Sequence, residues 1–218
     1  IENKNMSIES PIFTPVTIGP VTLRNRVIRS AAFENMAYGN SPSQDLYDSH
    51  VAVARGGVGM TTLAYAAADR SGLSFDGPPW MRKEIVPDLR RITDAIHAEG
   101  AKASIQLGHC GNMTHRSTCG CMPVGASGSF NMYSPTFVRS LKVNEIHDLV
   151  KAFGNAVNLA REAGFDCVEI HAGHGYLISQ FLSPNTNHRH DEFGGSLENR
   201  MRFMRMVISE VMKAAGDD

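Results

Sequence analysis

Short apolar runs alternate with longer amphipathic segments along this chain, and that alternation constrains the fold more than any other feature of the sequence. Runs rich in Val, Ile, Leu and Ala predict buried strands, whereas apolar residues that recur every third or fourth position predict helices. Strands that are separated by helices pair in parallel through right-handed crossovers. The sequence therefore predicts an α/β fold in which helices pack against a parallel sheet.

Four strand–helix pairs follow a hairpin at 13–23, whose turn is marked by Gly19-Pro20. The predicted strands cover 26–32, 58–64, 101–107 and 165–171. The predicted helices cover 43–55, 87–99, a stretch from the N-cap Asn144 to Gly164, and a stretch from the N-cap Ser196 to Gly216. The segment 108–142 is rich in Gly, Ser, Pro and Thr and has no clear periodicity. We expect it to have a function or a small structure of its own.

Two architectures fit this order of elements, a doubly wound sheet and a (β/α)8 barrel. A dinucleotide-binding sheet would place a G-x-G-x-x-G motif after its first strand. The end of the first predicted strand instead reads Ala31-Ala32-Phe33-Glu34-Asn35, without glycine. The prediction is therefore a TIM (β/α)8 barrel, of which this chain supplies an N-terminal hairpin and the first four β-α units.

Composition and charge exclude several classes of protein. With 21 basic and 22 acidic residues, the 218-residue chain has a net charge of −1 and no basic run of the kind that binds nucleic acid. No apolar stretch is long enough to span a membrane, and the polar first residues lack the apolar core of a signal peptide. We expect no nucleic-acid or membrane partner, a start at 1–10 that is disordered or left by an expression vector, and a barrel domain at 11–218.

The four cysteines do not form a metal-binding pattern. Cys119 and Cys121 lie close together, but a single C-x-C matches neither a zinc nor an iron–sulfur spacing, and Cys110 and Cys167 stand apart. Reduced thiols are typical of the cytoplasm, which is where we expect this protein.

In barrels of this kind, catalytic side chains follow the carboxyl ends of the strands. The fourth predicted strand ends in the densest group, because His171, His174 and Tyr176 lie within six residues. Two imidazoles can donate hydrogen bonds to one oxygen and stabilise its negative charge, and a tyrosine can supply a proton as general acid. Gly173 and Gly175 allow a sharp turn there. The alternatives are a structural histidine with a core tyrosine, and a metal site, for which a third ligand is lacking.

The other three strand ends carry weaker signals. Gln106 offers a donor and an acceptor, which suits the edge of a planar heterocycle, although a buried glutamine satisfied by backbone groups is an equal alternative. Tyr65 could border a flat cofactor, whereas core packing is the more common role of such a residue. The small residues that begin at Ser30 would let a ligand lie against the backbone.

Two segments toward the carboxyl terminus carry a specific resemblance, EIHAGHGYLISQFLSPNTNHR at 169–189 and DEFGGSLENRMRF at 191–203. Shorter matches lie at 13–18, 23–27, 56–59 and 105–111. In these segments the chain resembles the Old Yellow Enzyme family of FMN-dependent NAD(P)H:flavin oxidoreductases and ene-reductases. The resemblance runs from about Pro11 onward.

The resemblance implies FMN at the mouth of a TIM barrel and its reduction by NAD(P)H. Hydride then passes to the β-carbon of an activated alkene, and a proton passes to the α-carbon. His171 and His174 match the pair that holds the substrate carbonyl oxygen, and Tyr176 matches the proton donor of many members. The residues that match flavin contacts are Ser30, Ala31, Ala32 and Phe33 along the ring system, Tyr65 beside it, and Gln106 on its pyrimidine edge.

The sequence also departs from the family pattern. Ala31 and Ala32 stand where many members have Pro and a larger residue, Phe33 where many have a flavin-tuning Thr or Cys, and Asn112 where Arg is common. The segment 29–34 resembles the subgroup that contains 2-enoate reductases. The resemblance further implies a flavin-contacting arginine on the fifth strand and phosphate-binding loops after strands seven and eight, all of which would follow residue 218.

We therefore expect FMN and NAD(P)H as cofactors and a small unsaturated molecule as substrate. Four parallel strands without their partners would leave an open edge and expose apolar barrel interior, so we also expect a homo-oligomer. The alternative to the enzyme is an isolated half-barrel without catalytic competence that acts as a self-associating or interaction module.

Overall fold

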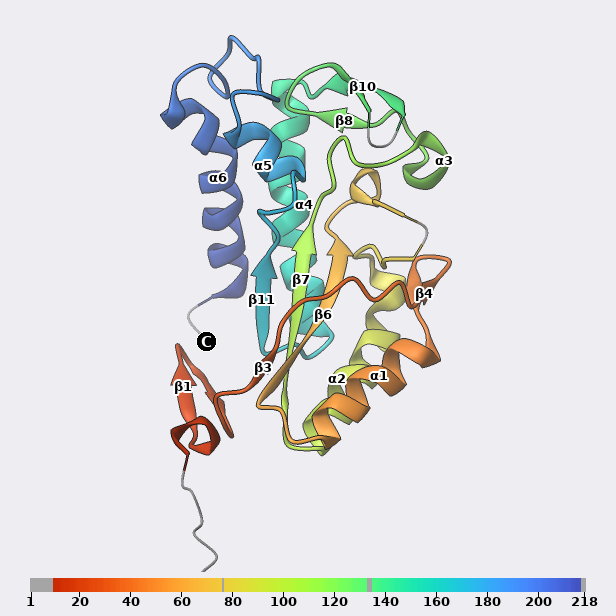
Figure 1. The fold of residues 1–218 in the computed structure, drawn as a ribbon, viewed down its shortest axis with the longest axis vertical. Helices are drawn as coiled ribbons and strands as arrows, with labels where there is room; N and C mark the ends of the chain where they lie inside the picture. Colours follow the sequence, from red (N-terminus) through yellow and green to blue (C-terminus); the bar gives the residue numbers. More distant parts are fainter. Residues whose placement is uncertain (1–9, 76, 133–134, 217–218) are drawn as a thin grey trace, which may run out of the picture.

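A four-stranded parallel sheet lies at the centre of the computed structural model, which describes residues 10–75, 77–132 and 135–216. The strands follow one another across the sheet in the order β11-β7-β6-β3 (Figure 1). They are β3 (Ile28–Arg29), β6 (Met60–Ala67), β7 (Lys102–Gly108) and β11 (Cys167–Ile170). The predicted parallel sheet is confirmed. Apart from Ser10, the start expected at 1–10 lies outside the described residues.

Four long helices follow the sheet strands in turn, as the crossover rule requires. They are α1 (Gln44–Arg55), α2 (Val86–Ala98), α4 (Val143–Glu162) and α6 (Leu197–Ala215). Figure 1 shows α4 behind the sheet, α1 and α2 on the side of β6, and α6 on the side of β11. The predicted apolar stripe of α2 faces the core, because Leu89, Ile92 and Ile96 are at most 2% exposed. Burial of such side chains stabilises the fold by about 1.5–3 kcal/mol each.

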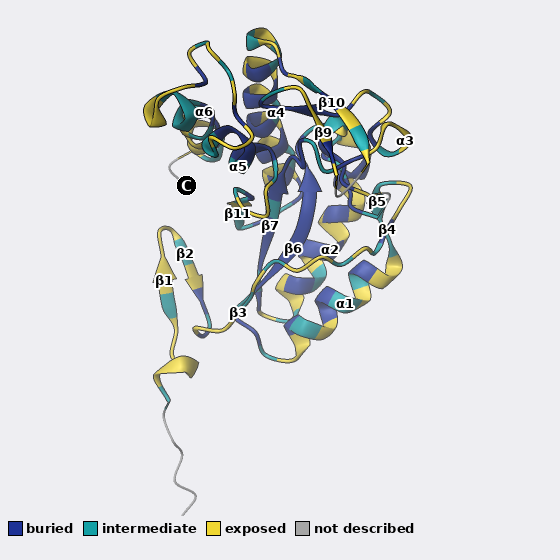
Figure 2. Ribbon diagram, turned by 45° about the horizontal axis from the view of Figure 1, so that its top comes forward, coloured by how far each residue is buried: buried dark blue, intermediate teal, exposed yellow. Residues whose placement is uncertain are grey.

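The hairpin lies near the amino ends of the sheet strands, away from the buried centre that β6 and β7 form (Figure 2). β1 (Val16–Ile18) pairs antiparallel with β2 (Val21–Leu23) around Gly19, whose φ is 56°. The predicted hairpin and its glycine turn are therefore confirmed. Its apolar side chains are only partly covered, since Ile18 is 53% exposed.

The long segment between β7 and α4 has a small structure of its own, as predicted. α3 (Arg116–Cys119) precedes a separate sheet in the order β8-β10-β9. The strands of this sheet are β8 (Val124–Gly125), β9 (Ser129–Asn131) and β10 (Thr136–Ser140). The remaining short elements are η1 (Pro11–Phe13), β4 (Ala37–Tyr38), β5 (Ser41–Pro42), η2 (Arg70–Gly72), η3 (Lys83–Ile85) and α5 (Leu177–Leu182).

Several boundaries differ from the sequence-based expectation. β3 contains only Ile28–Arg29, because only these residues of the first predicted strand pair with β6. α4 begins at Val143 and is not capped by Asn144. Its start is instead stabilised by the Glu145 carboxylate, which accepts a hydrogen bond from the Lys142 N–H at 2.7 Å. The helix α5 was not predicted, because it is too short to show a clear period.

β3 and β11 are the edge strands of the described sheet. Ile28 of β3 is 41% exposed, and every residue of β11 is at least partly exposed. Closure of a barrel requires each strand to have a neighbour on both sides, so these are the two places where a barrel would continue. Within the described ranges, no helix is both long and apolar enough to cross a membrane.

Candidate active site

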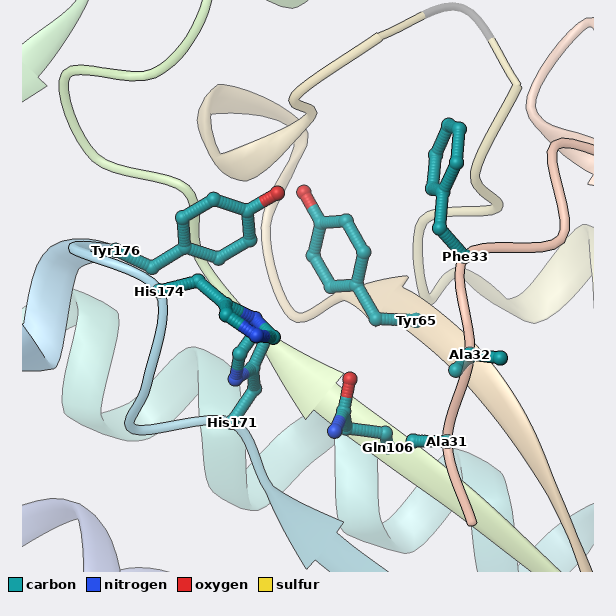
Figure 3. A pocket seen from close by; sticks show the side chains of 9 residues that line it. Ala31, Ala32, Phe33, Tyr65, Gln106, His171, His174 and Tyr176 are labelled. Carbon is teal, nitrogen blue, oxygen red and sulfur yellow. The ribbon is translucent and has the colours of Figure 1, made fainter. Parts of the chain in front are cut away.

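A pocket opens at the carboxyl ends of the sheet strands (Figure 3). Its volume is about 140 Å³, which is smaller than the range of about 300–1,000 Å³ that is typical of complete small-molecule sites. Each of the four strands, or the segment that directly follows it, contributes to the wall of the pocket. The lining residues are Ala31, Ala32 and Phe33 after β3, Ala64 and Tyr65 in β6, Gln106 in β7, and His171, His174 and Tyr176 after β11.

The loop after β11 turns sharply and brings three side chains over the pocket (Figure 3). It is anchored at its start, where the His171 N–H donates to the Leu107 carbonyl of β7 at 2.8 Å. His174 and Gly175 then adopt left-handed backbone conformations, with φ of 56° and 69°. The loop ends at Tyr176, which is the N-cap residue of α5. The turn predicted from the glycines is therefore present, although His174 itself takes one of the left-handed positions.

His171 and His174 contact each other. His171 Nε2 lies 3.1 Å from His174 Nδ1, and the Gly173 N–H donates to His171 Nδ1 at 3.4 Å. Because His171 Nδ1 accepts, the His171 proton sits on Nε2 and is donated to His174, which leaves the His174 Nε2–H as a free donor. Burial, followed by the neighbouring His174, lowers the pKa of His171, so this ring is neutral at neutral pH. No group of three His, Cys, Asp or Glu side chains able to hold a metal occurs among the described residues.

Two tyrosines border the pocket, and their hydroxyls point toward each other (Figure 3). Tyr65 is 4% exposed, and its hydroxyl donates to the Gly72 carbonyl at 2.6 Å and accepts from the Ser74 N–H at 3.0 Å. The Tyr176 ring is half-buried, 5.7 Å from the Tyr65 ring and 4.8 Å from the His171 ring between centroids. Burial raises the pKa of both phenols, so both keep their protons at neutral pH. The Tyr65 proton is committed to the backbone, whereas the Tyr176 proton is not.

Gln106 is oriented by a side chain that the sequence analysis missed. Its Nε2 donates to Glu169 Oε1 at 2.5 Å, and the two residues are direct partners in the pairing of β7 with β11. The Gln106 amide oxygen points into the pocket and remains available as an acceptor (Figure 3). A carboxylate, and not the backbone, therefore satisfies this glutamine. The cross-strand neighbour is the signal that could have identified Glu169, because facing residues on paired strands interact.

A buried carboxylate fixes the segment that follows β3. The Glu34 side chain is 4% exposed, and its Oε1 lies 2.7 Å from Arg29 Nη1 and 2.9 Å from His50 Nε2. His50 belongs to α1, and its Nδ1 lies 2.9 Å from Thr61 Oγ1 of β6. Glu34 therefore ties this segment to a helix and to the neighbouring strand. The backbone of 31–33 is held along one side of the pocket as a result (Figure 3).

The pocket brings together eight of the nine residues singled out from the sequence. The exception is Ser30, which is exposed and does not line the pocket. Ala64 lines the pocket and was not predicted, because a methyl group at a strand end carries no chemical signal. The roles assigned to the nine residues stay predictions.

Parallel strands with hydrogen-bond donors, a protonated phenol and a slot of small side chains at their carboxyl ends define part of a (β/α) barrel with a small-molecule site. The chain belongs to the NADH:flavin oxidoreductase / NADH oxidase family, whose model matches residues 11–218. This membership confirms the resemblance that the sequence motifs indicated.

Named relatives support the same family and fold. The 4,4'-dithiodibutanoate disulfide reductase of Rhodococcus erythropolis is 40% identical over 205 residues, which are 94% of this chain and 51% of that protein. An old yellow enzyme homologue from Zymomonas mobilis is 31% identical, with a TM-score of 0.87 over 95% of this chain and 61% of that one. Morphinone reductase in complex with tetrahydroNAD is 28% identical, with a TM-score of 0.86 over the same shares. The chain spans about half to three fifths of these proteins and folds as the first half of a TIM barrel.

Proposed function

We propose that this chain carries the substrate-binding and proton-donating part of an FMN-dependent oxidoreductase that uses NAD(P)H to reduce an activated alkene of the enone or enoate type. The observation that carries the proposal is the group formed by His171, His174 and Tyr176 at the pocket (Figure 3). Residues 11–218 would form the N-terminal half of the FMN-binding barrel. The other half of the barrel would resemble the corresponding part of the longer relatives.

The pocket residues fit the flat ring system of FMN. Ala31 and Ala32 leave the backbone after β3 open to the slot, and the Gln106 amide oxygen offers an acceptor at its edge (Figure 3). Bound there and reduced by NAD(P)H, FMN would supply the hydride for the alkene. The lining residues in the described chain include no Lys or Arg, so the FMN phosphate would be bound by groups outside this pocket.

The chain's own side chains would bind the substrate oxygen and move one proton. The His174 Nε2–H is free to donate, and the His171 Nε2–H becomes a second donor once the substrate oxygen displaces His174 Nδ1. Donors that are already in place stabilise the negative charge that develops on a carbonyl oxygen. Tyr176 would deliver its proton to the α-carbon. Tyr65 is less suited to be the proton donor, because its hydroxyl already donates to the Gly72 carbonyl.

The substitution Tyr176→Phe tests this assignment. We expect the flavin-loaded variant to reduce an enone about 10²–10⁴-fold more slowly than the wild type, because loss of a general acid typically has that cost. Reduction of the flavin by NAD(P)H should keep its wild-type rate. Stopped-flow absorbance of the flavin separates the two half-reactions. Tyr38→Phe is the matched control, because it removes an exposed hydroxyl that donates to Asp45. Equal slowing of both half-reactions would contradict the role of Tyr176.

The open sheet edges favour a second candidate function. β3 and β11 each have one neighbour in the described sheet, and unpaired strand edges promote association with other chains. A half-barrel of this kind would act as a homo-oligomeric or interaction module without catalysis. Gel filtration of the chain after incubation with FMN, followed by its visible spectrum, separates the two candidates. Retained flavin supports the enzyme, whereas a colourless oligomer supports the interaction module.

A further inference from the structure

A buried serine hydroxyl lies next to Tyr176 without a hydrogen bond of good geometry. Ser74 is 3% exposed, and its Oγ has no hydrogen-bond partner among the described residues. A buried hydroxyl without a partner is energetically unfavourable, so such an atom in a native fold calls for an explanation. The Ser74 side chain lies near both phenol oxygens, since it lowers the pKa of Tyr65 and of Tyr176 against the larger upward effect of burial. The Tyr65 oxygen already accepts from the Ser74 N–H at 3.0 Å, which leaves the Tyr176 oxygen as the acceptor for the Ser74 hydroxyl.

The backbone around Ser74 is held from several sides. The Ser74 N–H donates to the Tyr65 hydroxyl at 3.0 Å, and that hydroxyl donates to the Gly72 carbonyl at 2.6 Å. The carbonyl of Leu73, the residue between Gly72 and Ser74, accepts a hydrogen bond from Thr114 Oγ1 at 2.5 Å. These bonds connect the segment 72–74 to β6 and to the segment after β7. The position of the Ser74 hydroxyl is therefore determined by the core of the fold.

The other titratable groups that face Tyr176 offer no equivalent donor to its oxygen. They are Tyr65, His171, His174 and Cys110. The Tyr65 proton goes to a carbonyl, the His171 proton goes to His174, and the Cys110 thiol raises the pKa of Tyr176. The remaining donor, the His174 Nε2–H, is needed for the substrate oxygen. The Ser74 hydroxyl is the neutral donor left over for the phenol.

We propose that Ser74 is a positioning residue for Tyr176: its hydroxyl donates to the phenol oxygen, holds it at the pocket and stabilises the phenolate that remains after the proton has left. The inference rests on the proposed function, in which the reduced flavin supplies the hydride. The Tyr176 O–H bond breaks, its proton goes to the substrate α-carbon, and the electron pair stays on the phenolate oxygen. The Ser74 O–H bond stays intact, and Tyr176 regains its proton from water.

The test compares Ser74→Ala with Ser74→Thr, which keeps the hydroxyl. Thr114→Val is the control for a disturbed loop, because it removes the bond to the Leu73 carbonyl without removing the Ser74 hydroxyl. The pKa of Tyr176 is measured by NMR on protein labelled with ¹³C at the tyrosine ring, with the resonance assigned from Tyr176→Phe. This measurement needs neither flavin nor substrate. The two half-reactions of the flavin-loaded protein are followed separately.

We expect Ser74→Ala to raise the pKa of Tyr176 and to slow alkene reduction about tenfold, because a hydrogen bond to a charged group is lost. Flavin reduction should not change, Ser74→Thr should restore both values, and Thr114→Val should leave the pKa of Tyr176 as in the wild type. An unchanged pKa of Tyr176 in Ser74→Ala, or an equal shift in Thr114→Val, would overturn the inference. If the pKa shifts as expected but the wild type reduces no alkene, the contact between Ser74 and Tyr176 stands and the proposed function fails.

Discussion

Acid should loosen the loops around the pocket through one buried histidine. His109 is 2% exposed, and its Nδ1 accepts from the Gly111 N–H at 3.0 Å. Its Nε2 lies 3.0 Å from Ser71 Oγ, and Ser71 in turn donates to Asp69 Oδ1. Both ring nitrogens are therefore in use by the neutral tautomer. Protonation would place a hydrogen on Nδ1 and break the bond from Gly111.

The size of the effect follows from the pKa of His109. Burial lowers this pKa from 6.5 to about 4, although Asp69 acts in the opposite direction. Between these values the unfolded chain binds a proton at His109 that the folded protein does not, so stability falls as the pH falls. The loss begins near pH 6.5 and is complete near pH 4. At about 1.4 kcal/mol per pH unit, it amounts to about 3 kcal/mol.

Urea unfolding of the wild type and of His109→Gln at pH 7 and pH 4 measures this loss. Glutamine has a donor and an acceptor but does not titrate, and all carboxylates are common to both proteins. We expect the wild type to lose about 3 kcal/mol more than the variant over this interval. Parallel losses in the two proteins would refute the assignment of this acid sensitivity to His109.

Two further substitutions, together with one surface control, test the packing around the pocket. Glu34→Ala should lower the free energy of unfolding by about 3–5 kcal/mol, because it removes the buried carboxylate that contacts Arg29 and the buried His50 ring. Arg55→Ala breaks an ion pair whose arginine side chain is 70% exposed, so it should lower the free energy of unfolding by at most about 1 kcal/mol. Urea unfolding measures both variants. Equal losses in Glu34→Ala and Arg55→Ala would contradict the argument from burial. Gly108→Ala would place a methyl group 3.0 Å from His171 Cβ and from Tyr65 Cδ2, so it should shift the His171 resonances in NMR spectra and cost about 1–3 kcal/mol. Unchanged His171 resonances would show that the neighbouring side chains yield without moving the site.

The alternation of strands and helices in the sequence was enough to predict the architecture, because hydrophobic period is a local property. The misplaced start of α4 shows the limit of local signals. Asn144 is the better intrinsic cap, but the Glu145 carboxylate is held by Arg139 at 2.7 Å and accepts from the Lys142 N–H. A contact with a residue on β10 thus decides where the helix begins. Cap preferences alone cannot report such a contact.

The same distinction applies to the site. His171, His174 and Tyr176 could be grouped from the sequence because they lie on one short loop after one strand. Glu169 and Ser74 could not, because each acts on a residue of another segment. The role of Glu169 requires the register of β11 on β7, and that of Ser74 requires the fold of the segment after β6. Pairing and loop geometry are set by the whole sheet, so a single sequence does not reveal them.

The electrostatics of the pocket also indicate which substrates it would favour. Burial lowers the pKa of His171 and raises the pKa of Tyr176, so both side chains are neutral donors at neutral pH. The lining residues of the described pocket include no Lys or Arg that could neutralise an anion already present on the substrate. A neutral imidazole donor at the substrate oxygen, with a neutral phenol as the proton source, favours a group that is uncharged when it binds and gains negative charge in the transition state. For the proposed reaction, we infer that an enone or ester carbonyl would be held better than a free carboxylate.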